Sequence, residues 1–230
     1  MDLYVIEQQG AQDRLAVWQK MGTTWILFIT VSFTYVIISW ILQHYVITDT
    51  FYIHNFSGKL SLDQIQTLLH LRHSWAWIGY AFIPVSLLIK VGYAATAINI
   101  GLVLFDIDLG FKSIFQAALV GESVFIIASV VELSGLLWWH PVHTTMALSN
   151  FDPLTLASLM NISNVPRWLW YPLKTINVYE VAYCLVIAGY LTSQFQQDFK
   201  EMLADVIISY GSALVLWMCV IVFISLQIIQ

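Results

Sequence analysis

The sequence predicts an all-α fold, a polytopic transmembrane helical bundle with about five spans and two amphipathic interfacial helices in the long loops on one side. Hydrophobic residues make up 59% of the 230 residues and charged residues only 10%, whereas a soluble domain carries about 25% charged residues. Five apolar stretches also match or approach the roughly 20 residues that a helix needs to cross a bilayer. We therefore interpret residues 1–230 as a single integral membrane domain.

The predicted spans cover residues 22–46, 75–105, 111–139, 176–195 and 204–229. The second is about thirty residues long and contains Pro84, but no polar turn interrupts it, so we expect one tilted or kinked helix. The short polar segment 106–110 then predicts a tight turn. The second and third spans should therefore pack as an antiparallel hairpin.

Both long loops contain helix-start signals. Ser61 is followed three residues later by Gln64, a capping-box pattern, and apolar residues then recur at helical spacing. Asp152 precedes Pro153, which is the favoured order of an N-cap and the first helical residue. These patterns predict the two interfacial helices, the first of them continuous with the second span.

Charge gives the orientation and excludes one class of partner. The basic residues divide evenly between the two sides, but Arg14 and Lys20 precede the first span, which favours a cytoplasmic N-terminus. The net charge is −5 and no run of Lys or Arg exists. A nucleic-acid partner is therefore not expected, because it needs a clustered basic face.

Isolated ionisable residues inside the predicted spans are the main candidate site: Lys90, Glu122, Glu132 and Glu180. A charge in hydrocarbon costs roughly 3 kcal/mol on insertion scales, so it normally faces protein or water and finds a partner. Counted from the hairpin turn, Lys90 and Glu122 differ in depth by only about 6 Å, so they can form an ion pair. Such a pair is typical of a proton or ion relay or of a polar groove, and equally of a structural contact between helices.

The histidines suggest a second candidate site. His70 with His73, and His140 with His143, both have the spacing His-x-x-His, and the first pair shares one helix face. Pro141 interrupts the second pair, and histidine also suits a membrane interface. We expect no cofactor, and keep a metal or haem site at these four histidines as an alternative.

The stretch 166–183, followed by Ala188, Gly189, Tyr190 and Leu191, resembles bacterial members of the Yip1-like family, in which an aromatic entry precedes a glycine-containing fourth span. The five-span plan and the hairpin of the second and third spans are also similar. The short N-terminal tail departs from the family's eukaryotic members. The resemblance implies a non-enzymatic membrane protein that works with partners, and it supplies no catalytic residues.

Three functions remain open. The sequence contains no zincin, nucleophile-elbow, P-loop or dinucleotide-binding motif. We therefore favour a non-enzymatic subunit of a bacterial inner-membrane transport or secretion complex, which binds other membrane proteins in a hetero-oligomer. The first alternative is a small ion-coupled transporter that uses the intramembrane Lys and Glu residues. The second is a metal- or haem-dependent membrane enzyme built on the histidines.

Overall fold

The computed structural model describes residues 2–138, 148, 151–160 and 165–228, with backbone alone at 2–21, 167 and 228. It is all-α and 86% helical, with no strand in these residues. The elements are α1 (Asp2–Ile41), the π-helical turn η1 (Leu42–Val46), α2 (Asp49–Phe56), α3 (Leu62–Leu104), α4 (Phe111–Trp138), the 3-10 turn η2 (Leu156–Leu159), α6 (Arg167–Thr175), α7 (Val178–Phe195) and α8 (Phe199–Ile228).

Four helical segments in the described part of the chain are long and apolar enough to cross a membrane. They are Gly22–Val46, Leu62–Leu104, Phe111–Trp138 and Phe199–Gln227. These segments match four of the predicted spans and are compatible with an integral membrane protein. The predicted span at 176–195 corresponds to α7, which has 18 residues and is therefore about 27 Å long.

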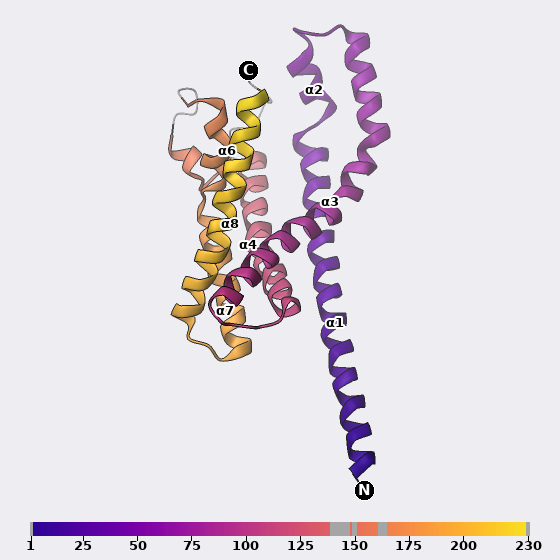
Figure 1. Ribbon diagram of the computed structural model, residues 1–230. Coiled ribbons are helices and arrows are strands. Elements are labelled where there is room, and N and C mark those ends of the chain that lie inside the picture. The colour runs from indigo at the N-terminus through magenta and orange to yellow at the C-terminus, as the bar shows by residue number, and fades with distance from the viewer. Residues whose placement is uncertain (1, 139–147, 149–150, 161–164, 229–230) are drawn as a thin grey trace.

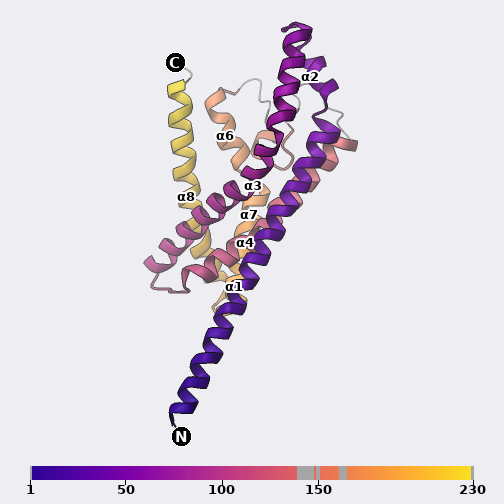
Figure 2. The same cartoon turned by 90° about the vertical axis from the view of Figure 1, so that its right-hand side faces the viewer.

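The helices run alternately up and down, so that the two ends of the chain lie at opposite ends of the molecule (Figure 1). α7 packs between α4 and α8, while α3 crosses both α4 and α8. α1 packs on the outer side of α4 and α3, and its N-terminal part extends beyond the other helices (Figures 1 and 2). α4 therefore lies at the centre of the bundle, because it contacts α1, α3 and α7.

α3 is one continuous helix of 43 residues, as the absence of a polar turn predicted. Its first turn has the expected capping box, because the Ser61 side chain accepts from the Gln64 backbone and the Gln64 side chain accepts from the Ser61 backbone. The helix changes direction along its length (Figures 1 and 2). Pro84 is the one proline inside it, and proline bends a helix because it lacks the N–H and clashes with the preceding turn.

The predicted turn between α3 and α4 is present and ends α3 with a Schellman motif. Asp106 lies in the left-handed region at φ 59°. Its N–H donates to the Val103 carbonyl, and the N–H of Ile107 donates to the Leu102 carbonyl, which is the pattern of that motif. The turn satisfies the last carbonyls of α3 and returns the chain antiparallel as α4.

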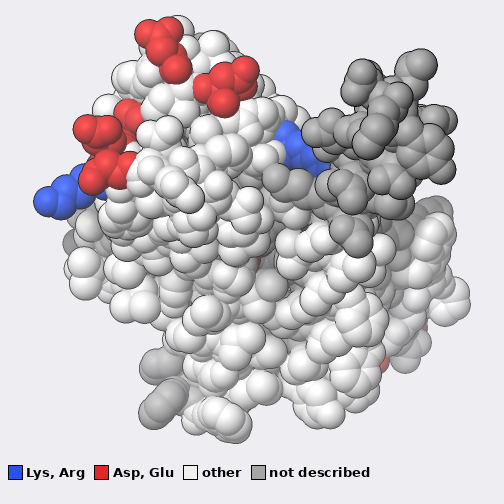
Figure 3. All heavy atoms as spheres, turned by 90° about the horizontal axis from the view of Figure 1, so that it is seen from below, with Lys and Arg blue, Asp and Glu red and all other residues white. Residues whose placement is uncertain are grey.

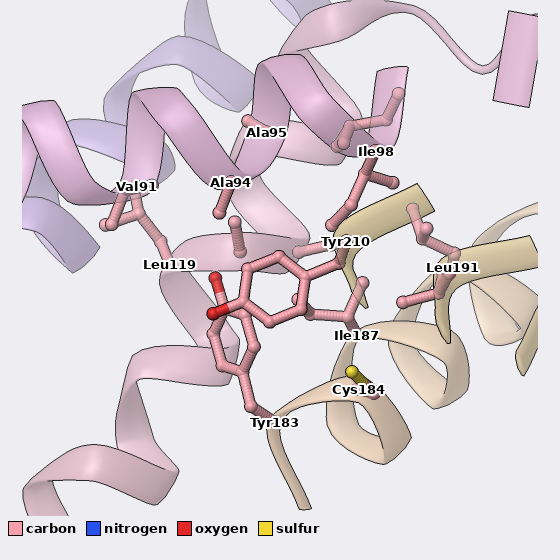
Figure 4. Packing of buried hydrophobic residues seen from close by; sticks show 14 of the residues in the cluster. Val91, Ala94, Ala95, Ile98, Leu119, Tyr183, Cys184, Ile187, Leu191 and Tyr210 are labelled. Atoms are coloured by element: carbon pink, nitrogen blue, oxygen red, sulfur yellow. The ribbon is translucent and has the colours of Figure 1, made fainter. Parts of the chain in front are cut away.

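The core lies where α3, α4, α7 and α8 meet. Figure 4 shows small and branched side chains of α3 facing α7 and α8, among them Ala94, Ala95 and Ile98. Tyr183 of α7 and Tyr210 of α8 lie beside each other with ring centroids 5.1 Å apart. Small residues on α3 let the backbones approach closely, which is how membrane helices gain contact in the absence of a hydrophobic driving force.

One end of the bundle is acidic. Seen from the end that holds the α3–α4 and α7–α8 connections, carboxylates gather over one part of the surface (Figure 3). The exposed acidic residues of these two connections are Asp106, Asp108, Asp198 and Glu201. Charged groups in such number stay hydrated, so they mark a boundary of any membrane-crossing part.

The prediction of a second interfacial helix, starting at Pro153, is wrong in its extent. Residues 153–160 form only the 3-10 turn η2, and Thr155 caps it in place of Asp152. Leu154 is left-handed at φ 62°. The N–H of Leu156 donates to the Ile176 carbonyl and the N–H of Val178 donates to the Leu154 carbonyl. These bonds tie the segment to the start of α7, and no α-helix begins at Pro153.

Candidate functional site

An ion pair between α3 and α4 lies at the centre of the candidate site. The Nζ of Lys90 is 3.0 Å from each carboxylate oxygen of Glu122. The Tyr35 hydroxyl of α1 donates to the same carboxylate at 2.9 Å. Glu122 is fully buried, whereas the Lys90 side chain is 46% exposed. Lys90 also lies 3.6 Å from the centroid of the Phe125 ring, a cation–π contact.

The Lys90 side chain is exposed because it faces a cavity of about 710 Å³. Residues of α1, η1, α3, α4, α6 and α7 and of the loop before η2 line this cavity, which we call the vestibule. Its deepest lining residues on α1, α3 and α4 are Tyr35, Lys90 and Glu122, and it extends to Asp152 and Asn177 at the loop end. The vestibule therefore connects the loops with the middle of the bundle.

The vestibule is closed below the ion pair. Small and branched residues of α3 and α4 occupy the next positions toward the acidic end, and each is at most 3% exposed: Val91, Ala94, Ala95, Ala117, Ala118 and Leu119. None of them lines the vestibule. Among the described residues the vestibule is thus blind: it ends at the ion pair and does not continue between α3 and α4 toward the acidic end.

Four further charged groups lie around the vestibule or next to it. Glu132, one of the predicted residues, lines it. So do Asp152 and Lys174, which form an ion pair at 2.5 Å. Glu180 instead faces a neighbouring cavity and accepts a hydrogen bond from the Tyr210 hydroxyl at 2.8 Å. The structure therefore brings Lys90 and Glu122 together and leaves Glu132 on the same wall, while Glu180 shares only the neighbouring cavity with Lys90.

The histidine alternative is only partly within the described structure. His70 and His73 both lie on α3 and are exposed, and the Nε2 of His73 is 3.2 Å from an Asp49 oxygen. His140 and His143 lie outside the described residues. Within the described ranges no group of three or more His, Cys, Asp or Glu residues has a metal-binding arrangement. The metal or haem alternative therefore stays a prediction.

Arg72 fastens α2 to α3 and was not identified from the sequence. Its guanidinium donates to the Ile47 carbonyl at 2.5 Å, to the Gln43 carbonyl at 3.3 Å and to Asp49 at 3.1 Å. It also lies 4.8 Å from the centroid of the Tyr52 ring. Arg72 thereby satisfies carbonyls at the end of η1, and α2 with the first turns of α3 forms a hairpin that projects from the other helices (Figure 1).

Sequence reasoning also missed the Asp152 to Lys174 pair and the Tyr35 contact. Tyr35 is 87 residues from Glu122, and no local pattern marks a contact at such separation. The pairing of Asp152 with Lys174 depends on the loop path, which the sequence did not give correctly. The only sequence signal for this ion pair was that Asp152 and Lys174 both lie close to apolar spans.

Comparison of the chain with protein-family models, with curated proteins and with solved structures finds no match.

Proposed function

We propose that the protein is a small ion-coupled membrane carrier that takes a cation into the vestibule from the loop end. The observation that carries this proposal is a blind, charged cavity that reaches the middle of an apolar bundle. Ionisable residues at such depth usually mark an ion or substrate path. A site at mid-depth that is open toward one end and closed toward the other is the geometry that alternating access requires.

The charges of the vestibule favour a cation. Two basic and three acidic residues line it. Lys90 pairs with Glu122, and Lys174 pairs with Asp152, so Glu132 remains as the surplus acidic group. A surplus carboxylate in a site with restricted water attracts cations more strongly than it would in bulk solvent.

The proposal includes five crossings. α7 is about 27 Å long, close to the roughly 30 Å hydrocarbon thickness, and it packs between two helices that are long enough to cross. Five crossings agree with the opposite positions of the two chain ends. In a bacterial inner membrane with a cytoplasmic N-terminus, the vestibule would face away from the cytoplasm.

Cation uptake by liposomes containing the purified protein tests the proposal. An imposed potassium diffusion potential would drive uptake, and internal dyes for protons and for sodium would report it. We expect uptake by the native chain, a decrease of about tenfold in Glu132→Gln, and no uptake in the double variant Lys90→Leu/Glu122→Gln. The matched control is Glu201→Gln, which changes an exposed carboxylate at the acidic end. Native-chain liposomes that take up neither cation would refute the carrier, as would equal uptake by all variants.

A second candidate function is a partner-binding subunit of a transport or secretion complex. The projecting hairpin of α2 and early α3 supports it, because exposed apolar residues such as Leu62, Leu68 and Leu71 lie on that part of α3. The resemblance to the Yip1-like family implies the same kind of role. Gentle extraction from the native host followed by mass spectrometry tests it: a stoichiometric membrane protein that is lost on Arg72→Ala supports this role, and a lone protein argues against it.

A further inference from the structure

We propose that a second cavity, between α3, α6, α7 and α8, binds an organic ammonium group. This cavity has a volume of about 560 Å³ and lies beside the vestibule, with Lys90 and Lys174 lining both. The proposed function above concerns Glu132 and the vestibule. The present site is centred on Glu180 and does not depend on that function.

The negative charge in this cavity comes from one carboxylate. Glu180 is the acidic residue that lines it, and Lys90 and Lys174 are the basic ones. Both lysines direct their ammonium groups to carboxylates of the vestibule, at Glu122 and Asp152. Glu180 has no basic side chain within ion-pair distance among the described residues, and it accepts a hydrogen bond from Tyr210. A carboxylate in an apolar setting gains most from a cation that comes to it.

Aromatic rings line the same cavity as this carboxylate. Five line the cavity: Tyr93, Tyr171, Tyr183, Tyr210 and Trp217. Figure 4 shows Tyr183 and Tyr210 side by side, with their hydroxyl oxygens at the same end of the pair. An ammonium group is attracted to the faces of such rings, and a set of rings around one acidic group is the arrangement that recognises alkylated ammonium ions.

Hydrogen bonds hold the rings in place without a ligand. The Trp217 indole N–H donates to the Tyr171 hydroxyl at 2.7 Å. The Tyr93 hydroxyl donates to the Ala213 carbonyl at 2.7 Å, and its ring centroid is 5.9 Å from that of Trp217. Rings that are already fixed lose little conformational entropy on binding, so the site is preorganised.

The cavity is accessible from the side of the bundle. Its lining residues Ile89, Trp217 and Tyr93 are substantially exposed, at 65%, 42% and 38%. They belong to α3 and α8, which are both apolar membrane-crossing candidates. An ammonium group can therefore arrive on a lipid headgroup or on a free solute, and the chemistry that the site recognises is the same.

Calorimetry of the full-length protein in a detergent without amine groups tests the site with choline. The control ligand is 3,3-dimethyl-1-butanol, which has the shape of choline without its charge. We expect choline to bind at least about tenfold more tightly than this alcohol. Equal affinity of the two compounds would overturn the proposal, and this comparison needs only the native chain, so it does not depend on a variant that folds.

Two variants locate the binding. Glu180→Gln should weaken choline binding about tenfold, and Trp217→Leu should weaken it severalfold. Glu201→Gln and Trp138→Leu, which change exposed residues away from the cavity, should leave the affinity unchanged. Choline binding that survives in Glu180→Gln would also overturn the proposal.

Native mass spectrometry separates the two sources of the ammonium group. Retention of phosphatidylcholine in preference to phosphatidylglycerol, with loss in Glu180→Gln, would show that a lipid supplies the group. Choline binding without such retention would show that a free solute supplies it. Failure of both choline binding and lipid preference would refute the site while leaving cation uptake through the vestibule untouched.

Discussion

The Cα of Ser209 on α8 lies 3.1 Å from the place where a Cβ on Gly101 of α3 would stand, and the Ser209 side chain lies closer still. Gly101 is therefore the residue that allows α3 and α8 to cross in contact. The Ser209 hydroxyl donates to the Asp205 carbonyl of its own helix, so its position is fixed. A larger residue at position 101 must separate the two helices.

Gly101→Ala should destabilise the protein by about 1–3 kcal/mol, the usual cost of overpacking a close contact. Thermal unfolding in detergent would measure it. Gly92→Ala on the same helix is the matched control, because a Cβ there meets nothing within 4 Å, and alanine should be neutral or favourable by up to about 1 kcal/mol. Equal stability of the two variants would show that the α3–α8 contact does not require glycine.

Lys90→Leu should destabilise the protein by about 3 kcal/mol, because it leaves the buried Glu122 with Tyr35 alone. This is the low end for a broken buried pair, since the Lys90 side chain is partly exposed. Removal of both charges in Lys90→Leu/Glu122→Gln should cost less than Lys90→Leu alone. Chemical denaturation of the single and double variants gives the coupling energy. Additive effects would mean that the pair contributes no interaction of its own.

Arg72→Lys should loosen the projecting hairpin without lowering the stability of the bundle. Lysine cannot reproduce the fork of donors that reaches Asp49, Ile47 and Gln43. Amide hydrogen exchange should therefore increase over residues 42–60 and stay unchanged in α7. The control is Lys59→Arg, which keeps a basic residue on the hairpin. Unchanged exchange in Arg72→Lys would show that apolar contacts alone hold α2 on α3.

Ser129→Cys should react with a charged thiol reagent added from one side of the membrane, because Ser129 lines the vestibule. Ala118→Cys, below the ion pair and fully buried, should not react. Both are made in a Cys219→Ser background, since Cys219 is exposed and Cys184 is buried. Mass spectrometry of the labelled protein measures the reaction. Labelling of Ala118→Cys would contradict a closed floor.

The sequence was sufficient to predict the features that depend on local patterns alone. Hydropathy located four long helices, the capping box located the start of α3, and the short polar segment 106–110 located the hairpin turn. Counting residues from that turn was enough to pair Lys90 with Glu122. Each of these predictions depends only on residues in one helix or in two helices joined by one turn.

The sequence was insufficient where the outcome depends on distant groups. The Asp152-Pro153 signal predicts a helix, but backbone bonds to Ile176 and Val178 tie that segment to the start of α7, and it forms only a 3-10 turn. Glu180 was predicted to belong to one candidate site with Lys90, Glu122 and Glu132, yet it lies in another cavity, where Tyr210 of α8 donates to it. No sequence motif marks Arg72. It binds backbone carbonyls only because η1 ends beside it in the fold.

The buried contact between α3 and α4 beneath Glu122 limits how an ion could cross the bundle. Val91, Ala94, Ala117 and Ala118 are at most 3% exposed and do not line the vestibule, so within the described part of the chain it does not continue between α3 and α4. For the proposed carrier, an ion in the vestibule would be stopped at this seam. Net passage of an ion through the proposed carrier would therefore require α3 and α4 to separate along this seam, so the rate of that separation would limit transport.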